Sequence, residues 1–531
     1  MRFLLALWVG KAVAWAIGVF FPRRGTNKSG VIACRLAPRF LEGFSGVDPK
    51  KTIVITGTNG KSTSNNMIVH AFRTAGHSVA TNLEGANMKT GIATALIKNS
   101  TPLGRVRTDY VILEVDERNL QIVRKAIPAG FLCVTNIQKD QVQRNGDPDY
   151  IYRKILGAID ESVTVFVNNE EPRSSALSGA AGRAVRFSVA RNERESLVET
   201  DGFAVTMPCP ICHDALAFSY YNLANIGGFS CPTCGFSSSK DPDYRVDFVD
   251  YAAKTFSIGG RSFHMEYDAA HFLYNYALCY AVATEFGLTL DQVGRAFESF
   301  RNVGGRLEEF TYAGTRIRYL RIKQENPETL QTAIDDVSTC SPADPPCHPV
   351  DSPRHPADPL RHPADPLCHP ADPLRHPAEG RIPAAPSGLR GSCLRQDDKK
   401  SGADDKGGKN DKGGKNDKGG SVLVLGLQLV HDVVPHYSNT AYSFDCNLQP
   451  LFDGGIDSCV CFGRANCYDA ATRLVYAGFP TEKIIVVDSD RPKDVLEAVA
   501  GCRARRAYLV TMIGEYEALR AQAEHESGAN P

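Results

Sequence analysis

The feature that most constrains the fold is the stretch TIVITGTNGKST, residues 52–63. Its apolar start, Thr52–Ile55, predicts a buried strand, and the sequence NNMIVHAFRTAG that follows predicts a helix. Backbone N–H groups at such a turn attract phosphate, a lysine reaches the β and γ oxygens, and a hydroxyl can hold Mg²⁺. We therefore expect a nucleotide phosphate loop formed by Gly57, Thr58, Asn59, Gly60, Lys61, Ser62 and Thr63.

Length, charge and cysteine content limit the class of protein. A chain of 531 residues is too long for one core, so two or three domains are expected. Lysine plus arginine and aspartate plus glutamate both total 60, so the overall charge does not indicate a nucleic-acid partner. The 16 cysteines are scattered over a long, enzyme-like chain, which favours a reducing, cytoplasmic setting.

Residues 30 to about 335 alternate short β-branched runs with amphipathic helical stretches, which predicts an α/β fold with a mostly parallel sheet. Two of the strands are YVILEV at 110–115 and GFLCVTNI at 130–137. Ligands collect at the carboxyl ends of such strands. The polar residues at those ends are Lys61, Glu114, Asp116, Asn136 and Asp140.

Glu114 is the candidate catalytic carboxylate of this edge. Beside a phosphate loop it predicts a Mg²⁺ ligand that acts with Ser62, because Mg²⁺ on phosphates takes one or two carboxylates. The alternative reading is a strand-end carboxylate in a surface salt bridge.

Four cysteines form two C-x-x-C pairs separated by eighteen residues. This spacing predicts a tetrahedral Zn²⁺ site in which the protein fills every position, so the metal is structural. Free thiols, a redox C-x-x-C and a nucleic-acid-binding ribbon are the alternatives; the redox reading leaves the second pair unexplained, and no basic cluster flanks the site. The predicted zinc ligands, within a ribbon at about 205–240, are Cys209, Cys212, Cys231 and Cys234.

The N-terminal stretch FLLALWVGKAVAWAIGVFF is apolar over nearly a membrane length. Lys11 interrupts it, and no A-x-A cleavage site follows it before Arg23 and Arg24. A packed or membrane-surface helix is therefore favoured over a membrane span or a signal peptide. A surface helix would give a peripheral membrane contact.

Residues 339–420 change composition abruptly. The unit RHPADPL at 354–360 repeats and fades, and Gly/Lys/Asp repeats follow it. Such dense proline and glycine predicts a disordered insertion. Its histidines and cysteines could bind metal, but a repeat expansion is the simpler reading, and Cys347 and Cys368 are not predicted ligands.

The loop has the form T-G-T-N-G-K-S, with Ile55 where the generic phosphate loop has its first glycine, and in this it resembles the Mur ligases and folylpolyglutamate synthetase. With the four-cysteine ribbon, the chain resembles the MurT family, the ligase subunits of lipid II isoglutaminyl synthase. The match runs from near residue 3 to about 335 and resumes near 421. It rests on LALWVGKAV, NLEGANMKTGIATAL at 82–96, LEVDERNL at 113–120, TNIQKDQVQRNGDPD at 135–149, HFLYNYALCYAVA at 271–283 and FRNVGGRLEEF at 300–310.

This resemblance implies ATP-dependent amidation of the α-carboxyl of D-glutamate in the lipid II stem peptide, through an acyl phosphate. It also implies a GatD-type glutaminase partner that supplies ammonia, and work in the cytoplasm at the inner face of the membrane. Asn275 and Arg306 match nucleotide contacts of the wider family, and Asn87 is a weaker candidate on the substrate side. No nucleic-acid partner is implied.

The last segment, 421–531, starts with the apolar run SVLVLGLQLVHD and predicts a second α/β, Rossmann-like domain. In the MurT family an aspartate of this domain completes the partner's Cys-His-Asp triad, where it orients the histidine. Asp432, at the end of a predicted strand, is favoured over Asp445. Either residue could instead be a turn or helix cap.

Several positions depart from the family pattern. Asp140-Gln141 stands where many Mur ligases have Asp-His, and Gln143 replaces a later aspartate. KQENPETL at 323–330 is two residues longer before its proline, and HYSN at 436–439 replaces the family's D-G-R-D. These departures weaken the assignment of the family's residue roles to the corresponding positions of this sequence.

The expected organisation is a lead-in at 1–45, a central ATP-binding domain at 46–310, a link at 311–338, the insertion, and the C-terminal domain. Two other functions are also compatible with the phosphate loop. One is a folylpolyglutamate-like or cyanophycin-like amide ligase, which does not predict the ribbon. The other is a non-catalytic subunit that binds ATP and zinc.

Overall fold

The structure is a computed structural model of the whole chain. It describes residues 2–20, 27–82, 86–139, 147–191, 207–223, 225–267, 270–301, 308–322, 326–339, 420–427, 441–453, 455–464 and 466–527. The predicted insertion, Arg306 and Asp432 lie outside these residues, as do Asp140, Gln141 and Gln143.

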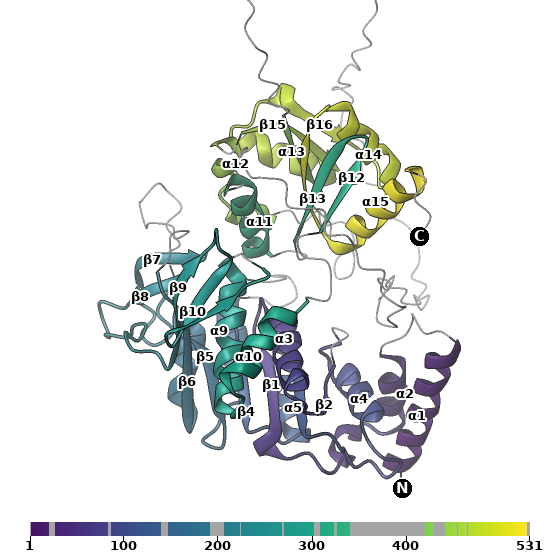
Figure 1. Ribbon diagram of the computed structural model, residues 1–531, viewed down its shortest axis with the longest axis vertical. Helices are drawn as coiled ribbons and strands as arrows, with labels where there is room; N and C mark the ends of the chain where they lie inside the picture. Colours follow the sequence, from purple (N-terminus) through teal and green to yellow (C-terminus); the bar gives the residue numbers. More distant parts are fainter. Residues whose placement is uncertain are drawn as a thin grey trace, which may run out of the picture. The chain divides into compact units, whose positions relative to one another are not determined.

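The first sheet has nine strands in the order β11-β10-β9-β6-β5-β4-β1-β3-β2 (Figure 1). From β2 through β9 all neighbouring strands are parallel, whereas β9, β10 and β11 are antiparallel. This confirms the predicted α/β class with a mostly parallel sheet. The strands are β1 (Thr52–Thr56), β2 (Val79–Ala80), β3 (Tyr110–Glu114), β4 (Phe131–Val134), β5 (Thr164–Asn168), β6 (Arg183–Val189), β9 (Tyr244–Asp250), β10 (Thr255–Ile258) and β11 (Arg261–His264).

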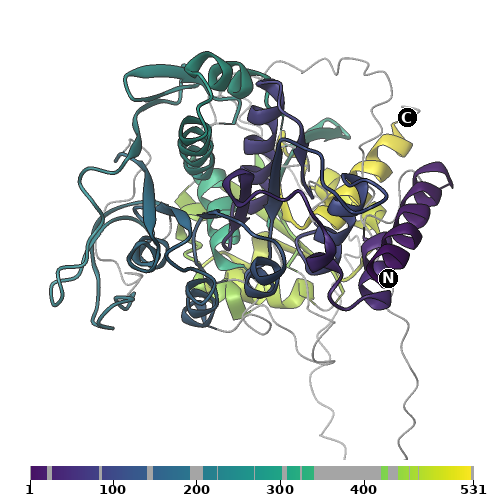
Figure 2. The same ribbon diagram turned by 90° about the horizontal axis from the view of Figure 1, so that it is seen from below.

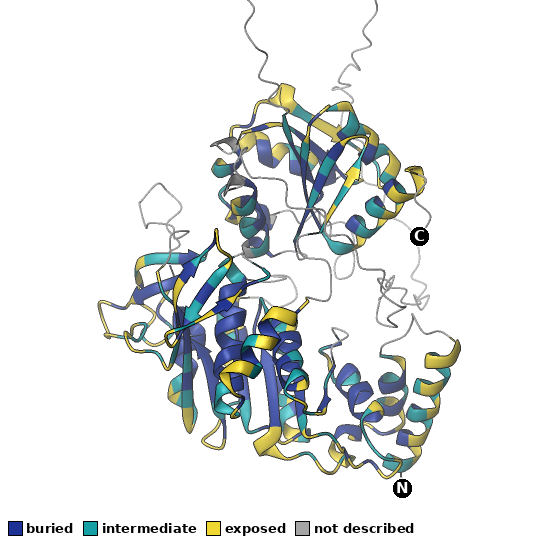
Figure 3. Cartoon of the chain, in the orientation of Figure 1, coloured by how far each residue is buried: buried dark blue, intermediate teal, exposed yellow. Residues whose placement is uncertain are grey.

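Strand β1 lies inside this sheet, between β4 and β3, and is buried along its whole length (Figure 3). Its side chains alternate between two cores: Ile53 and Ile55 pack with one set of helices, and Val54 packs with the other. The first set is α3 (Lys61–Thr74), α9 (Ala270–Glu285) and α10 (Leu290–Ser299). The second includes α4 (Lys89–Lys98), α5 (Leu120–Ala126) and α7 (Pro148–Leu156).

The register of the sheet sets the position of the site. Ile55 of β1 lies opposite Glu114 of β3, and Thr56 lies opposite Val134 of β4. The loops that follow β1, β3 and β4 therefore emerge side by side, at the carboxyl ends of these parallel strands. The short helix α8 (Pro172–Ala176) follows β5.

The N-terminal segment forms two helices, α1 (Arg2–Phe20) and α2 (Lys28–Leu36), that pack with α4. Figure 2 shows α1 in purple beside the N-terminal label. Ala6 and Leu7 of α1 and Ala33 of α2 are buried in the core that also contains Val54. The predicted N-terminal helix is thus packed against the domain along one side.

A separate hairpin, β7 (Ala217–Leu223) and β8 (Ile226–Ser230), carries the cysteine pairs at its base. Its small core contains Met207, Leu216 and Phe229 together with Cys209 and Cys231. This is the predicted ribbon.

The second sheet has the order β12-β13-β17-β14-β15-β16, in which every pair except β12–β13 is parallel. Two strands of this sheet, β12 and β13, precede the insertion in sequence. Segment 311–338, predicted to be a link, therefore contributes to the second sheet. The strands are β12 (Glu309–Tyr312), β13 (Thr315–Arg321), β14 (Ser421–Leu425), β15 (Ile456–Phe462), β16 (Ile484–Val487) and β17 (Arg506–Thr511). The helices are α11 (Pro327–Thr339), α12 (Gln449–Asp453) and α13 (Asn466–Tyr476), with α14 (Pro492–Gly501) and α15 (Ile513–Glu526).

Candidate functional site

The loop between β1 and α3 has the backbone of a phosphate loop. Gly60 precedes α3 with φ of 81°, and Gly57 has φ of 123°; both values lie in the region that favours glycine. A Cβ at Gly57 would lie 2.3 Å from Thr135 Oγ1 and 2.8 Å from the Asn136 carbonyl oxygen. No other residue fits at position 57 without moving the strand beside it.

The segment after β4 holds this loop in place. The Thr58 N–H donates to the Asn136 carbonyl (2.8 Å), and the Asn59 N–H donates to Asn136 Oδ1 (2.8 Å). In return Thr135 Oγ1 donates to the Asn59 carbonyl (2.7 Å). Protein groups alone therefore give the loop its shape, which is the preorganisation that a phosphate site needs.

Lys61, the predicted phosphate lysine, has a carboxylate partner. Its Nζ donates to Glu117 Oε1 at 2.6 Å and to the carbonyls of Gly57 and Thr58. Glu117 is buried, and burial raises the pKa of its carboxyl while the Lys61 charge opposes that rise. Glu117 was not predicted from the sequence, where its position three residues after Glu114 in LEVDE was the available signal.

Glu114 lies buried at the end of β3, as expected for a strand-end carboxylate that faces a site. Asn87 Nδ2 donates to Glu114 Oε1 at 3.1 Å, so two predicted residues meet here. Asn82 fixes the backbone on both sides, because its Nδ2 donates to the Glu114 carbonyl (2.8 Å) and its Oδ1 accepts from the Glu114 N–H (2.9 Å). Ser62 is exposed at the start of α3. Magnesium binding by Ser62 and Glu114 stays a prediction.

Asn275 of α9 lies against the opposite side of the loop. Its Oδ1 accepts from Ser64 Oγ at 3.0 Å, and a Cβ at Gly60 would lie 2.7 Å from the same oxygen. The side-chain nitrogen Nδ2 is buried and has no hydrogen-bond partner among the described residues. A buried amide donor without a partner indicates a place for a ligand acceptor.

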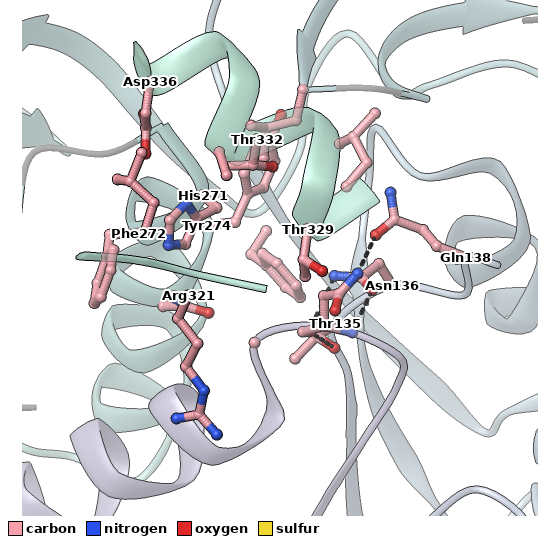
Figure 4. Close-up of a pocket in the computed structure, with 18 residues that line it drawn as sticks. Thr135, Asn136, Gln138, His271, Phe272, Tyr274, Arg321, Thr329, Thr332 and Asp336 are labelled. Carbon is pink, nitrogen blue, oxygen red and sulfur yellow. Dashed lines mark hydrogen bonds between the residues drawn. The ribbon is translucent and has the colours of Figure 1, made fainter. Parts of the chain in front are cut away.

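A cavity of about 110 Å³ opens beside Asn275 and the loop (Figure 4). Its polar lining includes groups of the loop, Asn136 and Gln138, and its apolar lining includes Phe187, Leu223 and Ile226. This mixture of apolar walls and few polar groups is typical of a small-molecule site. The other lining residues, none of them selected from the sequence except Asn59 and Gly60, are Asn59, Gly60, Thr135, His271, Phe272, Tyr274, Leu320, Arg321, Thr329, Thr332, Ala333 and Asp336.

The four cysteines form one cluster. Their Sγ atoms all lie within 4.8 Å of one another, with Cys209 to Cys234 at 3.7 Å and Cys212 to Cys231 at 3.4 Å. His213 and Gly235, each directly after a C-x-x-C pair, have φ of 68° and 75°. This left-handed backbone makes the chain turn tightly around the four sulfur atoms. Four converging thiols fit Zn²⁺ and leave no position for a substrate, which is consistent with the predicted structural site.

The Gln138 side chain links the ribbon to the phosphate loop. Gln138 Nε2 donates to Asn225 Oδ1 in the turn of the β7–β8 hairpin (2.6 Å), and Gln138 Oε1 accepts from Asn59 Nδ2 (3.0 Å). The Gly227 N–H of β8 also donates to the Glu170 carbonyl (3.0 Å). The hairpin is therefore joined to the phosphate loop through Gln138 and to the segment after β5 through Glu170, which the spacing of its cysteines did not predict.

Asp445, the second candidate for the partner triad, lies at the end of the short helix η4 (Ala441–Asp445). Its carboxylate pairs with Lys139 at 3.1 Å, and both side chains are about half exposed. Such an exposed ion pair contributes little to stability. Asp432 lies outside the described residues, so the choice between the two aspartates stays a prediction.

Two family models match this chain. The Mur ligase middle domain matches residues 55–205, and the MurT ligase C-terminal domain matches residues 415–519. The first match contains the phosphate loop and Glu114, and the second contains most of the second sheet.

Curated relatives agree with these models. The MurT subunit of lipid II isoglutaminyl synthase (glutamine-hydrolyzing) of Staphylococcus aureus (strain COL) is 28% identical over 291 residues, which are 54% of this chain and 64% of that protein. The chain thus spans slightly less than two thirds of that relative. The Streptococcus pneumoniae (strain ATCC BAA-255 / R6) subunit is 28% identical over 323 residues, 59% of this chain and 69% of its own.

Solved structures share the fold at low sequence identity. A pseudomurein peptide ligase type C from Methanothermus fervidus gives a TM-score of 0.58 with 13% identity, covering 92% of this chain and 81% of its own. UDP-N-acetylmuramoylalanyl-D-glutamyl-2,6-diaminopimelate–D-alanyl-D-alanyl ligase from Acinetobacter baumannii gives 0.52 with 11% identity, covering 94% and 80%. At these identities the likeness is one of fold.

Proposed function

The chain belongs to the MurT family of Mur ligases, and from this premise we propose that it is the ligase subunit of a lipid II isoglutaminyl synthase. The proposed reaction is ATP-dependent amidation of the α-carboxyl of D-glutamate in the lipid II stem peptide, to give D-isoglutamine. The observation that carries the proposal is the pairing, in one chain, of a preformed phosphate loop with the MurT C-terminal domain.

Phosphate binding is assigned to the loop. The backbone N–H groups of Asn59 and Gly60, the start of α3 and Lys61 would hold the β and γ phosphates of ATP. Lys61 now donates to Glu117 and to two loop carbonyls, so it would exchange some of these partners for phosphate oxygens. The cavity beside Asn275 would take the nucleoside, with Asn275 Nδ2 as a donor to it.

Activation of the carboxylate is assigned to the edge beside Glu114. The substrate carboxylate would attack the γ phosphate, ADP would leave, and ammonia would displace phosphate from the acyl phosphate. Mg²⁺ on the phosphates, when bound, neutralises the charge that develops in the first step, and Ser62 and Glu114 are the residues that would hold it. Asn87 orients the Glu114 carboxylate by its hydrogen bond.

The ammonia would come from a GatD-type glutamine amidotransferase bound as a heterodimer. Asp432, with Asp445 as the alternative, would complete the triad of that partner. The Zn²⁺ ion would stabilise the ribbon, and the pair of proteins would act in the cytoplasm at the inner face of the membrane.

The test is the mass of lipid II after incubation with the purified chain, ATP and ammonium, without a glutaminase. The expected product has an amide in place of one carboxyl group, and Lys61→Ala abolishes its formation. Lys125→Ala, an exposed lysine of α5, is the matched control and keeps full activity. Unchanged lipid II with the wild-type chain, or the same product with Lys61→Ala, would contradict the proposal.

A further inference from the structure

The exposed side of α1 carries a continuous apolar stripe. Trp15 is 68% exposed, Val19 54% and Trp8 53%, and Leu5 lies on the same side one turn earlier. The spacing 5, 8, 12, 15, 19 places these residues and Ala12 on one helix face. Figure 3 shows exposed positions along this helix. Large apolar side chains gathered in this way indicate an interaction surface.

The opposite side of α1 is fixed to the domain. Gly10 lies so close to α4 that a Cβ there would be 2.8 Å from Ile97 Cδ1. Lys11 Nζ donates to the carbonyls of Ile97 (2.6 Å) and Ser100 (2.5 Å), at the end of α4. Alone among the helices of the described chain, α1 is long and apolar enough to cross a membrane. Crossing would break these contacts, so the packed helix is suited to lie on a membrane.

The apolar surface continues beyond the helix. Trp8 Nε1 donates to the Pro102 carbonyl at 2.8 Å, and the next residue, Leu103, is 72% exposed. Arg105 and Arg107 follow Leu103 and are exposed as well. Indole rings next to leucine and arginine side chains match the region between lipid chains and headgroups.

Basic residues predominate in the sequence around α1, and Glu42, near the Phe40 ring that packs on Phe3 of α1, is paired with Arg39. Neither residues 1–41 nor residues 86–108 include an aspartate or a glutamate. Their basic residues are Arg2, Lys11, Arg23, Arg24, Lys28, Arg35, Arg39, Lys89, Lys98, Arg105 and Arg107. The chain as a whole is neutral, so this concentration of positive charge is local.

We propose that the exposed face of α1, with Leu103, docks on the surface of a bilayer that contains anionic lipids. The apolar stripe enters the interface and the surrounding basic residues are attracted to the lipid phosphates. A second copy of the chain fits this face less well, because pairing would bring two predominantly basic surfaces together. The inference does not depend on the proposed reaction, since it concerns a surface and not the phosphate loop.

The chain itself provides the probe. Its two tryptophans, Trp8 and Trp15, both lie on this face, so intrinsic tryptophan fluorescence reports on α1 alone. The full-length chain is titrated with vesicles of phosphatidylcholine, with and without phosphatidylglycerol. We expect a blue shift of the emission with the anionic vesicles, a smaller one with phosphatidylcholine alone, and reversal by salt.

Trp15→Gln leaves Trp8 as the reporter and keeps a good helix former on the face. We expect it to weaken partitioning into anionic vesicles about tenfold. Tyr476→Gln removes an equally exposed aromatic ring from α13 and should leave partitioning unchanged. If Trp15→Gln does not fold, quenching of the wild-type tryptophans by brominated lipids measures the same insertion.

Three results would overturn the inference. One is an emission spectrum that neither kind of vesicle changes. Another is equal partitioning of the wild type and Trp15→Gln, or no quenching by brominated lipids. The third is a blue shift that depends on protein concentration without lipid, which would assign the face to a second copy.

Discussion

The phosphate loop and the cysteine cluster are both turns built to surround an ion, but different forces hold them. Hydrogen bonds from Thr135 and Asn136 fix the loop, so its shape exists before any ligand arrives. The ribbon has only a small apolar core of Met207, Leu216 and Phe229 with its cysteines. Four thiols that converge without a metal gain little from one another.

The comparison shows that preorganisation can come from the surrounding protein or from the ion itself. The phosphate loop follows an interior strand of a nine-stranded sheet, so it has neighbouring strands on both sides. A hairpin outside that sheet does not, so we expect metal to be part of its folding free energy.

Removal of the metal should have the largest effect. Cys209→Ser, or a strong chelator, is expected to remove binding free energy on the order of 10 kcal/mol and to unfold the hairpin. Hydrogen exchange should rise across β7 and β8 while β1 stays protected, and zinc content should fall. Cys502→Ser is the control and should keep its zinc. A hairpin that stays protected from hydrogen exchange without metal would show that the ribbon, like the phosphate loop, is shaped by the protein alone.

Breaking the ion pair inside the loop should have the next largest effect. Lys61→Ala leaves Glu117 buried without its partner, which is expected to cost about 3 kcal/mol of unfolding free energy. The double variant Lys61→Ala with Glu117→Gln should recover most of this loss, because no buried charge remains. Urea denaturation of the single and double variants measures it. Equal stabilities of the single and double variants would show that the pair is not coupled.

The stability of the first sheet should depend on pH through two buried carboxyls. Burial raises the pKa of Glu170 and of Glu171 to about 7 from an ordinary value of 4.5. Between these values the folded state keeps protons that the unfolded state releases, so stability falls as pH rises from about 4.5 to 7.

The expected slope is about 1 kcal/mol per pH unit for each group, and Glu170→Gln should remove its share. Urea titrations across this range measure the slope. Glu285→Gln is the control, because its arginine partner lowers the pKa of that carboxyl instead. A wild-type stability that increases over the same range would reverse the sign assigned to these groups.

The smallest effect is expected from loss of the contact between the phosphate loop and the ribbon. Gln138→Ala removes the side chain that joins Asn225 of the hairpin to Asn59 of the loop, at a cost of about 1 kcal/mol. The dissociation constant for ATP should rise about fivefold while zinc content is unchanged. Gln121→Ala, which loses a single bond to the Lys154 carbonyl, should leave ATP binding as it is. If both variants bind ATP alike, the ribbon does not support the loop.

Features encoded by neighbouring residues were predictable from the sequence. The phosphate loop, the alternation of strands and helices, and the cysteine spacing are local patterns, and the structure confirms the α/β fold and the cysteine cluster. The partners of these features come from distant parts of the chain. The position of Glu117 beside Lys61 follows from the packing of β3 against β1, and Thr329 and Asp336 reach the cavity from α11. No local period encodes such contacts.

The second sheet is assembled from strands on both sides of a long stretch of sequence. Strand β17 lies between β13, which precedes the insertion, and β14, which follows it. The order of synthesis therefore matters: β13 and β14 leave the ribosome long before the strand that joins them. A longer insertion adds little to the entropic cost of bringing β13 and β14 into one sheet, since the cost of closing the connecting segment grows only with the logarithm of its length. Loss of β17, by contrast, would leave two strand edges without their common neighbour, so the sheet can close only after β17 has been synthesised.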